Sequence, residues 1–237
     1  MNPETSEAVV STWEPGAVGL LVIDMTKAFT ERGSAFDRNR RAAGLDTDYY
    51  FDRLEQVAVP AIMRVATAVR GSGGPVLWVK PLIVSSQARD WPPGLHAASM
   101  APLVPGTPAW GLTSGLTAER TDYEVPKQCV SSFWCGSADP ILRHRGVRHV
   151  LVAGCLTNGG MMVNAVDAAV RGYQVTVIED GCAALDPRSH EDALAAHPIY
   201  EVRTSADAVD ALSTASQDSR RTEGVTTRAP LKERNRP

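Results

Sequence analysis

The most constraining feature of this sequence is a series of short apolar runs that alternate with segments of helical periodicity. The first run, Val18–Ile23 (VGLLVI), is too short for a helix and is rich in aliphatic residues. Similar runs occupy residues 75–79, 147–153 and 173–178. Continuous runs of this kind are typical of strands that are buried on both faces of a parallel sheet.

Between these runs, apolar residues recur at helical spacing. Residues 51–70 place several aliphatic side chains on one helical face, and glycines at 71, 73 and 74 follow. Residues 161–170 predict a second helix, and residues 206–212 a short closing helix. Strands alternating with helices predict an α/β fold, a three-layer α/β/α arrangement around a mainly parallel sheet. We expect residues 15–212 to form this single domain.

The two ends differ from this domain in composition. Residues 213–237 contain six Lys or Arg, three Asp or Glu and almost no large apolar side chains. Such a segment buries too little apolar surface to offset the entropy of ordering it. We expect a disordered C-terminal tail over 213–237, with a partner-binding arm as the alternative, and a flexible N-terminal arm over residues 1–14.

Overall composition excludes several classes of protein. Lys and Arg number 24 against 27 Asp and Glu, a net charge of −3, which argues against a nucleic-acid partner. No stretch approaches the roughly 20 apolar residues that span a bilayer, and the N-terminus lacks the pattern of a signal peptide. Four cysteines in 237 residues do not make a disulfide framework. These features predict a cytoplasmic protein without a membrane partner.

Polar residues follow several predicted strands, and the carboxyl ends of parallel strands share one edge of the sheet. Asp24 follows the first strand, where it is either a partly desolvated carboxylate of raised pKa or a cap for the next turn. Lys80 follows the second strand and Lys127 ends a short extended segment. Trp91 lies in a turn-rich loop, as a pocket wall or as a cover for the core.

A glycine-bearing turn, residues 154–160 (GCLTNGG), follows the third strand and leads into a helix. Backbone N–H groups at such a helix start converge on one point, which suits an anion or oxyanion. Neither a phosphate-binding loop nor a dinucleotide fingerprint is present.

Three motifs in this order resemble one family. They are residues 20–25 (LLVIDM) followed by Phe29, Lys127 followed by Phe133, and residues 152–160 (VAGCLTNGG). Together they resemble the isochorismatase-like (cysteine hydrolase) superfamily, over about residues 16–212. That superfamily includes nicotinamidases, N-carbamoylsarcosine and maleamate amidohydrolases, and isochorismatases.

The resemblance implies site residues, with one departure. The superfamily's amidohydrolases use an Asp–Lys–Cys triad, whose first two members match Asp24 and Lys127. The nucleophilic cysteine would stand at position 160, which is glycine here; Cys155 lies in the same turn at a different place. Isochorismatases also carry glycine there, and they cleave an enol ether by protonation from the aspartate and addition of water.

Three functions remain open on this evidence. The first is a hydrolase without a covalent intermediate, built on Asp24 and Lys127, that acts on a small, anionic molecule. The second is an amidohydrolase whose nucleophile has moved to Cys155 or Cys135. The third is a binding protein that has lost turnover. A lysine at position 80, where isochorismatases typically have glutamine, would suit an anionic substrate.

The resemblance also implies the surroundings of the site. The expected substrate-binding residues are Phe29, Lys80, Trp91, Phe133, Cys155, Leu156 and Thr157. The peptide bond between Cys155 and Leu156 is expected to be cis, as in related proteins. Nicotinamidases bind a metal through Asp-x-His and a further histidine, whereas Asp90 is followed here by Trp91 and Pro92, with His96 alone nearby. We therefore expect no metal and no cofactor.

Relatives also suggest quaternary structure and context. Members of the superfamily are commonly homo-oligomers, and the aromatic loop residues Trp110 and Trp134 are candidate interface residues. From the same resemblance we expect the protein to act in secondary metabolism.

Overall fold

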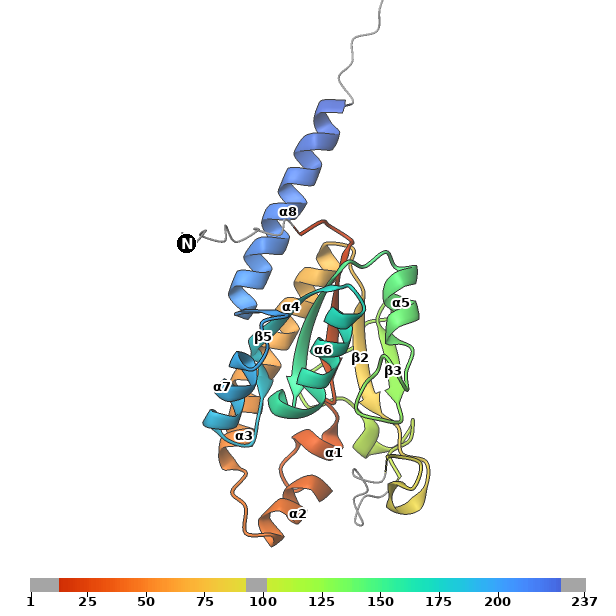
Figure 1. The fold of residues 1–237 in the computed structure, drawn as a ribbon, viewed down its shortest axis with the longest axis vertical. Helices are drawn as coiled ribbons and strands as arrows, with labels where there is room; N and C mark the ends of the chain where they lie inside the picture. Colours follow the sequence, from red (N-terminus) through yellow and green to blue (C-terminus); the bar gives the residue numbers. More distant parts are fainter. Residues whose placement is uncertain (1–12, 93–101, 227–237) are drawn as a thin grey trace, which may run out of the picture.

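The computed structural model describes residues 13–92 and 102–226, and a six-stranded sheet forms its centre (Figure 1). The strand order is β3-β2-β1-β4-β5-β6, and every neighbouring pair is parallel. The strands are β1 (Val18–Ile23), β2 (Val76–Pro81), β3 (Tyr123–Lys127), β4 (His149–Cys155), β5 (Gln174–Ala183) and β6 (Glu201–Arg203). The predicted parallel α/β fold is confirmed.

Helices cover both faces of this sheet and its carboxyl end (Figure 1). They are α1 (Lys27–Thr30), α2 (Ala35–Ala42), α3 (Asp48–Arg53), α4 (Val59–Gly71), α5 (Ala138–His144), α6 (Met162–Val170), α7 (Pro187–Ala195) and α8 (Ser205–Thr226). Two five-residue π-helical segments, Leu54–Ala58 and Thr157–Met161, lead into α4 and α6. Short 3₁₀ turns lie at Ser86–Ala88 and Pro108–Trp110.

Strand β1 shows why the sequence pattern succeeds. Its side chains alternate between two hydrophobic cores, with Leu20 packed in the core beneath α4 and α8 and Leu21 in the core beneath α5 and α6. All six residues of β1 are buried. A strand with a core on each face has no polar side, so its sequence reads as a continuous apolar run.

Both ends of the chain depart from expectation where the structure describes them. Helix α8 continues to Thr226, beyond Leu212, and Ala215 packs against the same core as Ala208 and Leu212. Trp13 is also buried, and its ring lies 4.8 Å from that of His149. The rest of the predicted arm and tail, residues 1–12 and 227–237, lies outside the described residues.

The two candidate interface tryptophans differ in exposure. Trp110 is buried and donates its indole N–H to the Pro81 carbonyl at 2.9 Å, so it offers no surface to a partner. Trp134 is 75% exposed. Among the described helices, none is both long and apolar enough to cross a membrane.

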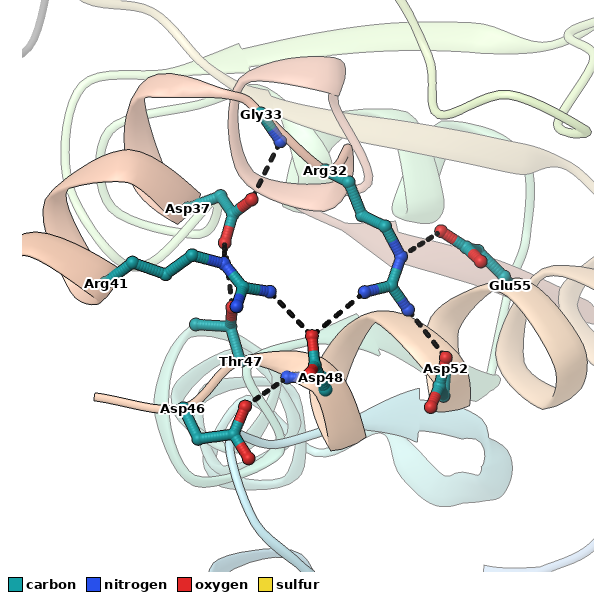
Figure 2. Close-up of polar contacts among 9 residues, drawn as sticks. All are labelled: Arg32, Gly33, Asp37, Arg41, Asp46, Thr47, Asp48, Asp52 and Glu55. Carbon is teal, nitrogen blue, oxygen red and sulfur yellow. Dashed lines mark hydrogen bonds and ion pairs between the residues drawn. The ribbon is translucent and has the colours of Figure 1, made fainter. Parts of the chain in front are cut away.

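Helices α1 to α3 form a cap beyond the carboxyl end of the sheet (Figure 1). Arg32, between α1 and α2, holds this cap to the following helical segment. Its guanidinium pairs with Asp48 at 3.2 Å, Asp52 at 2.6 Å and Glu55 at 3.1 Å (Figure 2). Pairs of this kind at the surface contribute little singly, but one shared cation orders three acids together.

A second group of contacts fixes α2 itself. The Asp37 carboxylate accepts hydrogen bonds from the Gly33 N–H at 2.7 Å and the Thr47 hydroxyl at 2.7 Å, and it pairs with Arg41 at 2.8 Å. Arg41 also pairs with Asp48 at 2.6 Å, which joins this group to the one around Arg32 (Figure 2). The network thus holds α2 against the start of α3 at the carboxyl edge of the sheet.

Candidate active site

Asp24 and Lys127 meet at the carboxyl edge of the sheet. Asp24 follows the last residue of β1 and has a positive φ of 57°, which is uncommon for a residue other than glycine. Lys127 ends β3, two strands away in the sheet. The Lys127 Nζ lies 3.0 Å from Asp24 Oδ2 and also donates to the Val130 carbonyl at 3.0 Å. The expected pairing of these two residues is present.

Burial dominates the electrostatics of this pair. Lys127 is 1% exposed, and the Oδ1 atom of Asp24 is buried without a hydrogen-bond partner among the described residues. Burial raises the pKa of the Asp24 carboxyl, and the nearby Lys127 ammonium opposes part of that rise. The carboxyl group therefore holds a proton to a higher pH than an exposed aspartate does.

A cavity of about 240 Å³ opens in front of the pair. Its walls are mainly apolar, and Asp24 and Lys127 bring the charged groups. The lining residues are Asp24, Phe29, Phe36, Tyr50, Pro81, Ile83, Trp91, Lys127, Val130, Cys155, Leu156, Gly159 and Gly160. A largely apolar pocket with a few converging polar groups is the usual form of a small-molecule site.

The end of β4 and the turn after it form part of the cavity wall through Cys155, Leu156, Gly159 and Gly160. The Cys155–Leu156 peptide bond is cis, as expected. Gly160 faces the carboxylate closely, because a β-carbon built on it would lie 2.7 Å from Asp24 Oδ2 and 3.4 Å from the Cys155 carbonyl oxygen. A side chain at position 160 would therefore enter the space that the Asp24 carboxylate occupies.

Asn164 ties this turn to the loop behind Lys127. It is fully buried in α6, and its amide donates to the Gly160 carbonyl at 2.7 Å and to the Val130 carbonyl at 3.0 Å. Its Oδ1 accepts from the Ser132 N–H at 2.9 Å and from the Ser132 hydroxyl at 2.7 Å. Sequence reasoning missed this residue, although an asparagine within the apolar pattern of α6 was a signal for it.

Seven of the ten predicted site residues line the cavity, and three do not. Lys80 is buried elsewhere, where it pairs with Glu124 at 2.5 Å and lies 3.4 Å from the Trp110 ring centroid. The Phe133 ring packs in the core against Tyr173. Strand position alone did not reveal which way these side chains point, so the expected second cation for the substrate is absent from the cavity wall.

Thr157, the third residue outside the lining, belongs to a buried polar network. Its hydroxyl lies 2.9 Å from His190 Nδ1, and Arg53 lies 2.8 Å from His190 Nε2. Because an arginine only donates, Nε2 accepts and Nδ1 carries the proton toward Thr157. Burial, with a further contribution from Arg53, lowers the pKa of His190 to about 4, so the ring is neutral.

The candidate cysteines are not activated. Burial raises the pKa of the Cys155 thiol to about 12, and its sulfur lies 3.5 Å from the Asp24 carbonyl oxygen. Cys135 is exposed and outside the cavity lining, and its pKa is raised to about 11, chiefly by a hydrogen bond with Cys129. A nucleophilic cysteine needs the opposite shift, toward a stable thiolate.

Within the described residues, no group of three or more His, Cys, Asp or Glu side chains is placed to hold a metal ion. Asp90 accepts hydrogen bonds from the backbone N–H groups of Val84 at 2.8 Å and Ser85 at 3.0 Å. It therefore orders its own loop. His96, the other residue considered for a metal, lies outside the described residues.

Comparison with known proteins identifies relatives for most of the chain. Residues 18–207 match the isochorismatase domain family. Maleamate amidohydrolase from Pseudomonas putida is 29% identical over 107 residues, which cover 42% of this chain and 50% of that protein. The isochorismatase family protein YecD from Escherichia coli O157:H7, itself uncharacterized, is 27% identical over 131 residues, or 55% of this chain and 69% of that protein.

Solved structures share the fold. An isochorismatase family protein from Desulfovibrio vulgaris superposes with a TM-score of 0.68 at 24% identity, over 83% of this chain and 98% of that one. An isochorismatase family protein from Burkholderia thailandensis gives a TM-score of 0.58 at 26% identity, over 84% and 96% respectively. N-carbamoylsarcosine amidase from Thermoplasma acidophilum gives 0.62 at 23% identity, over 79% and 96%.

Proposed function

Because this chain belongs to the isochorismatase family, we propose that it is a hydrolase of a small molecule that works without a covalent enzyme intermediate. Asp24 is the general acid, Lys127 orients it, and the glycine at position 160 leaves no side chain to act as nucleophile. Enol-ether cleavage of the kind that isochorismatases perform is the nearest chemical analogy.

The geometry of Asp24 carries this proposal. Its Oδ2 is held by Lys127 at 3.0 Å, while Oδ1 is buried without a partner among the described residues. An unpartnered buried oxygen is costly on a carboxylate and less costly on a neutral carboxyl group. The burial that raises the pKa of Asp24 thus favours a protonated form that can donate at the cavity.

The corresponding reaction balances without a further reagent. Asp24 donates its proton to the vinylic carbon of the enol ether, which leaves an oxocarbenium ion and a carboxylate beside Lys127. Water adds to the cation, and the proton that this water releases returns to Asp24. The resulting hemiketal then collapses to a ketone and an alcohol.

The structure gives little support to a relocated nucleophile. The pKa of Cys155 is raised to about 12 and that of Cys135 to about 11, so both remain thiols at neutral pH. Cys135 is also absent from the cavity lining. The matches to amidohydrolases support the family and the hydrolytic class. The raised pKa values of Cys155 and Cys135 argue against covalent amide hydrolysis by either thiol.

The test is an assay of the wild type and three variants against isochorismate, nicotinamide and maleamate. We expect turnover of the enol ether, a loss of at least about 100-fold in Asp24→Asn, and near wild-type rates in Cys155→Ala and Cys135→Ala. Inactivation of the wild type by iodoacetamide, together with loss of activity in Cys155→Ala or Cys135→Ala, would establish a cysteine nucleophile instead. Binding of these compounds without turnover of any would favour the degenerate binding protein.

A further inference from the structure

The cap formed by α1 to α3 carries several cations close to the cavity. They differ in whether an acidic side chain neutralises them. Arg32 pairs with three acids, Arg41 with two, and Lys27 with Glu31 at 3.5 Å. These three cations are therefore committed to the structure of the cap, and Figure 2 shows the contacts of Arg32 and Arg41.

Arg40 differs from its neighbours on α2. Its guanidinium lies 5.3 Å from the centroid of the Phe36 ring, and no acidic side chain of the described residues lies within ion-pair distance of it. Stacking on an aromatic ring uses the face of the guanidinium and leaves its N–H edge available for hydrogen bonds. That edge matches a carboxylate in bidentate geometry. Arg38, two residues earlier, instead donates to the Gly33 carbonyl.

Arg40 also lines a groove that adjoins the cavity at Asp24. Phe29 and Phe36 line both the cavity at Asp24 and an adjoining, wider groove of about 940 Å³ that Arg40 lines. A ligand whose body fills the cavity beside these rings has Arg40 as the cation next to its outer end. The Lys127 ammonium is already engaged by Asp24 Oδ2 at 3.0 Å and by the Val130 carbonyl at 3.0 Å.

We infer that Arg40 is a specificity-determining residue that recognises the anionic group of the substrate, a carboxylate or group of similar charge. This inference rests on the proposed function, because it assigns a substrate class to the same cavity. It also restores a cation for an anionic substrate, a role that Lys80 cannot fill because it is held by Glu124 away from the cavity. The substrate class is therefore a small anion with an apolar body and an anionic group directed away from Asp24.

The inference is tested by equilibrium binding, measured by calorimetry, with two probes of nearly equal shape. These are 3-phenylpropionate and its neutral methyl ketone analogue, 4-phenyl-2-butanone, which has no hydrolysable bond. We expect the wild type to prefer the acid, and Arg40→Gln to bind the acid about tenfold more weakly with little change for the ketone. Arg40→Lys should recover part of this loss because it restores the charge.

Arg38→Gln is the matched control, since Arg38 lines the same groove on the same helix. It should leave both affinities unchanged. Equal affinity of the wild type for the two probes, or failure to bind either, would overturn the inference. So would an equal loss in both arginine variants, or a loss for acid and ketone alike in Arg40→Gln. This experiment measures binding and no turnover. A preference for the acid would therefore support the role of Arg40 even if the assay shows no hydrolysis. Hydrolysis without that preference would support the proposed function and contradict the role of Arg40.

Discussion

The Asp24 carboxylate fills the space next to the α-carbon of Gly160, so that a β-carbon there would lie 2.7 Å from Asp24 Oδ2. Real β-carbons do not approach an oxygen this closely, and Gly160 is therefore required by the present position of the carboxylate. The same carboxylate oxygen is the one that Lys127 holds at 3.0 Å. Any side chain at position 160 must displace it.

The first prediction follows from this contact. Gly160→Ala should reduce hydrolysis on the order of 100-fold, because it displaces the general acid while it adds no chemistry of its own. Gly160→Cys should lose the native reaction similarly, yet gain weak activity toward nicotinamide or maleamate that Gly160→Ala lacks, since Asp24 and Lys127 would complete a triad. Steady-state rates of both variants, measured with the native substrate and with the two amides, test these expectations. A gain in the native reaction from Gly160→Cys would favour the degenerate binding protein.

The second prediction concerns the stability of the buried ion pair. At a pH above the pKa of Asp24, Asp24→Asn leaves the Lys127 ammonium buried without its counter-charge, and there we expect unfolding to become easier by about 3–5 kcal/mol. Adding Lys127→Met removes that charge at similar volume and should recover most of the stability, while activity stays lost. Urea unfolding of both variants measures the difference. A double variant no more stable than Asp24→Asn would contradict a penalty from the unpaired charge.

The third prediction is the pH dependence of the rate. A general acid must be protonated, so kcat/KM should fall as pH rises through the pKa of Asp24. The positive charge of Lys127 favours the carboxylate and opposes the rise in pKa that burial causes. Lys127→Met should therefore move the alkaline limb of the pH–rate profile to higher pH. A limb that moves to lower pH, or that persists unchanged in Asp24→Asn, would exclude Asp24 as the titrating acid.

The fourth prediction concerns stability in acid. The pKa of His190 is lowered to about 4 from an ordinary value near 6.5, so the folded protein binds fewer protons than the unfolded chain between these limits. Its contribution to the free energy of unfolding is complete above about pH 6.5 and is lost as pH falls toward 4. His149, whose pKa burial also lowers to about 4, acts in the same direction.

We therefore expect His190→Gln to flatten the dependence of the free energy of unfolding on pH between about 6.5 and 4. Denaturant titrations across that interval provide the measurement. His144→Gln is the control, because His144 is exposed in the last turn of α5. Equal slopes for the wild type and His190→Gln would show that the network around His190 does not set acid stability.

Much of the fold was readable from the sequence because burial leaves a strong local pattern. Val18–Ile23 is buried on both faces, so no polar residue interrupts it, and the strand could be identified in isolation. The short strand β6 was missed, because its three residues include a glutamate and an arginine and carry no apolar run. The closing helix was ended too early, since the contact of Ala215 with the core is a tertiary one.

In the candidate site, too, some features were predicted from the sequence and others depend on tertiary packing. Parallel topology predicts that residues ending strands gather at one edge, which placed Asp24 there. The resemblance of both motifs to the isochorismatase-like superfamily supplied Lys127 as its partner. Tertiary packing decided where the other side chains point. Lys80 lies next to the last residue of β2, but Glu124 and Trp110 hold it away from the cavity. The contacts of Asn164 join segments that are distant in the chain, and the role proposed for Arg40 depends on the absence of an acidic partner. Neither property is encoded in the local sequence pattern.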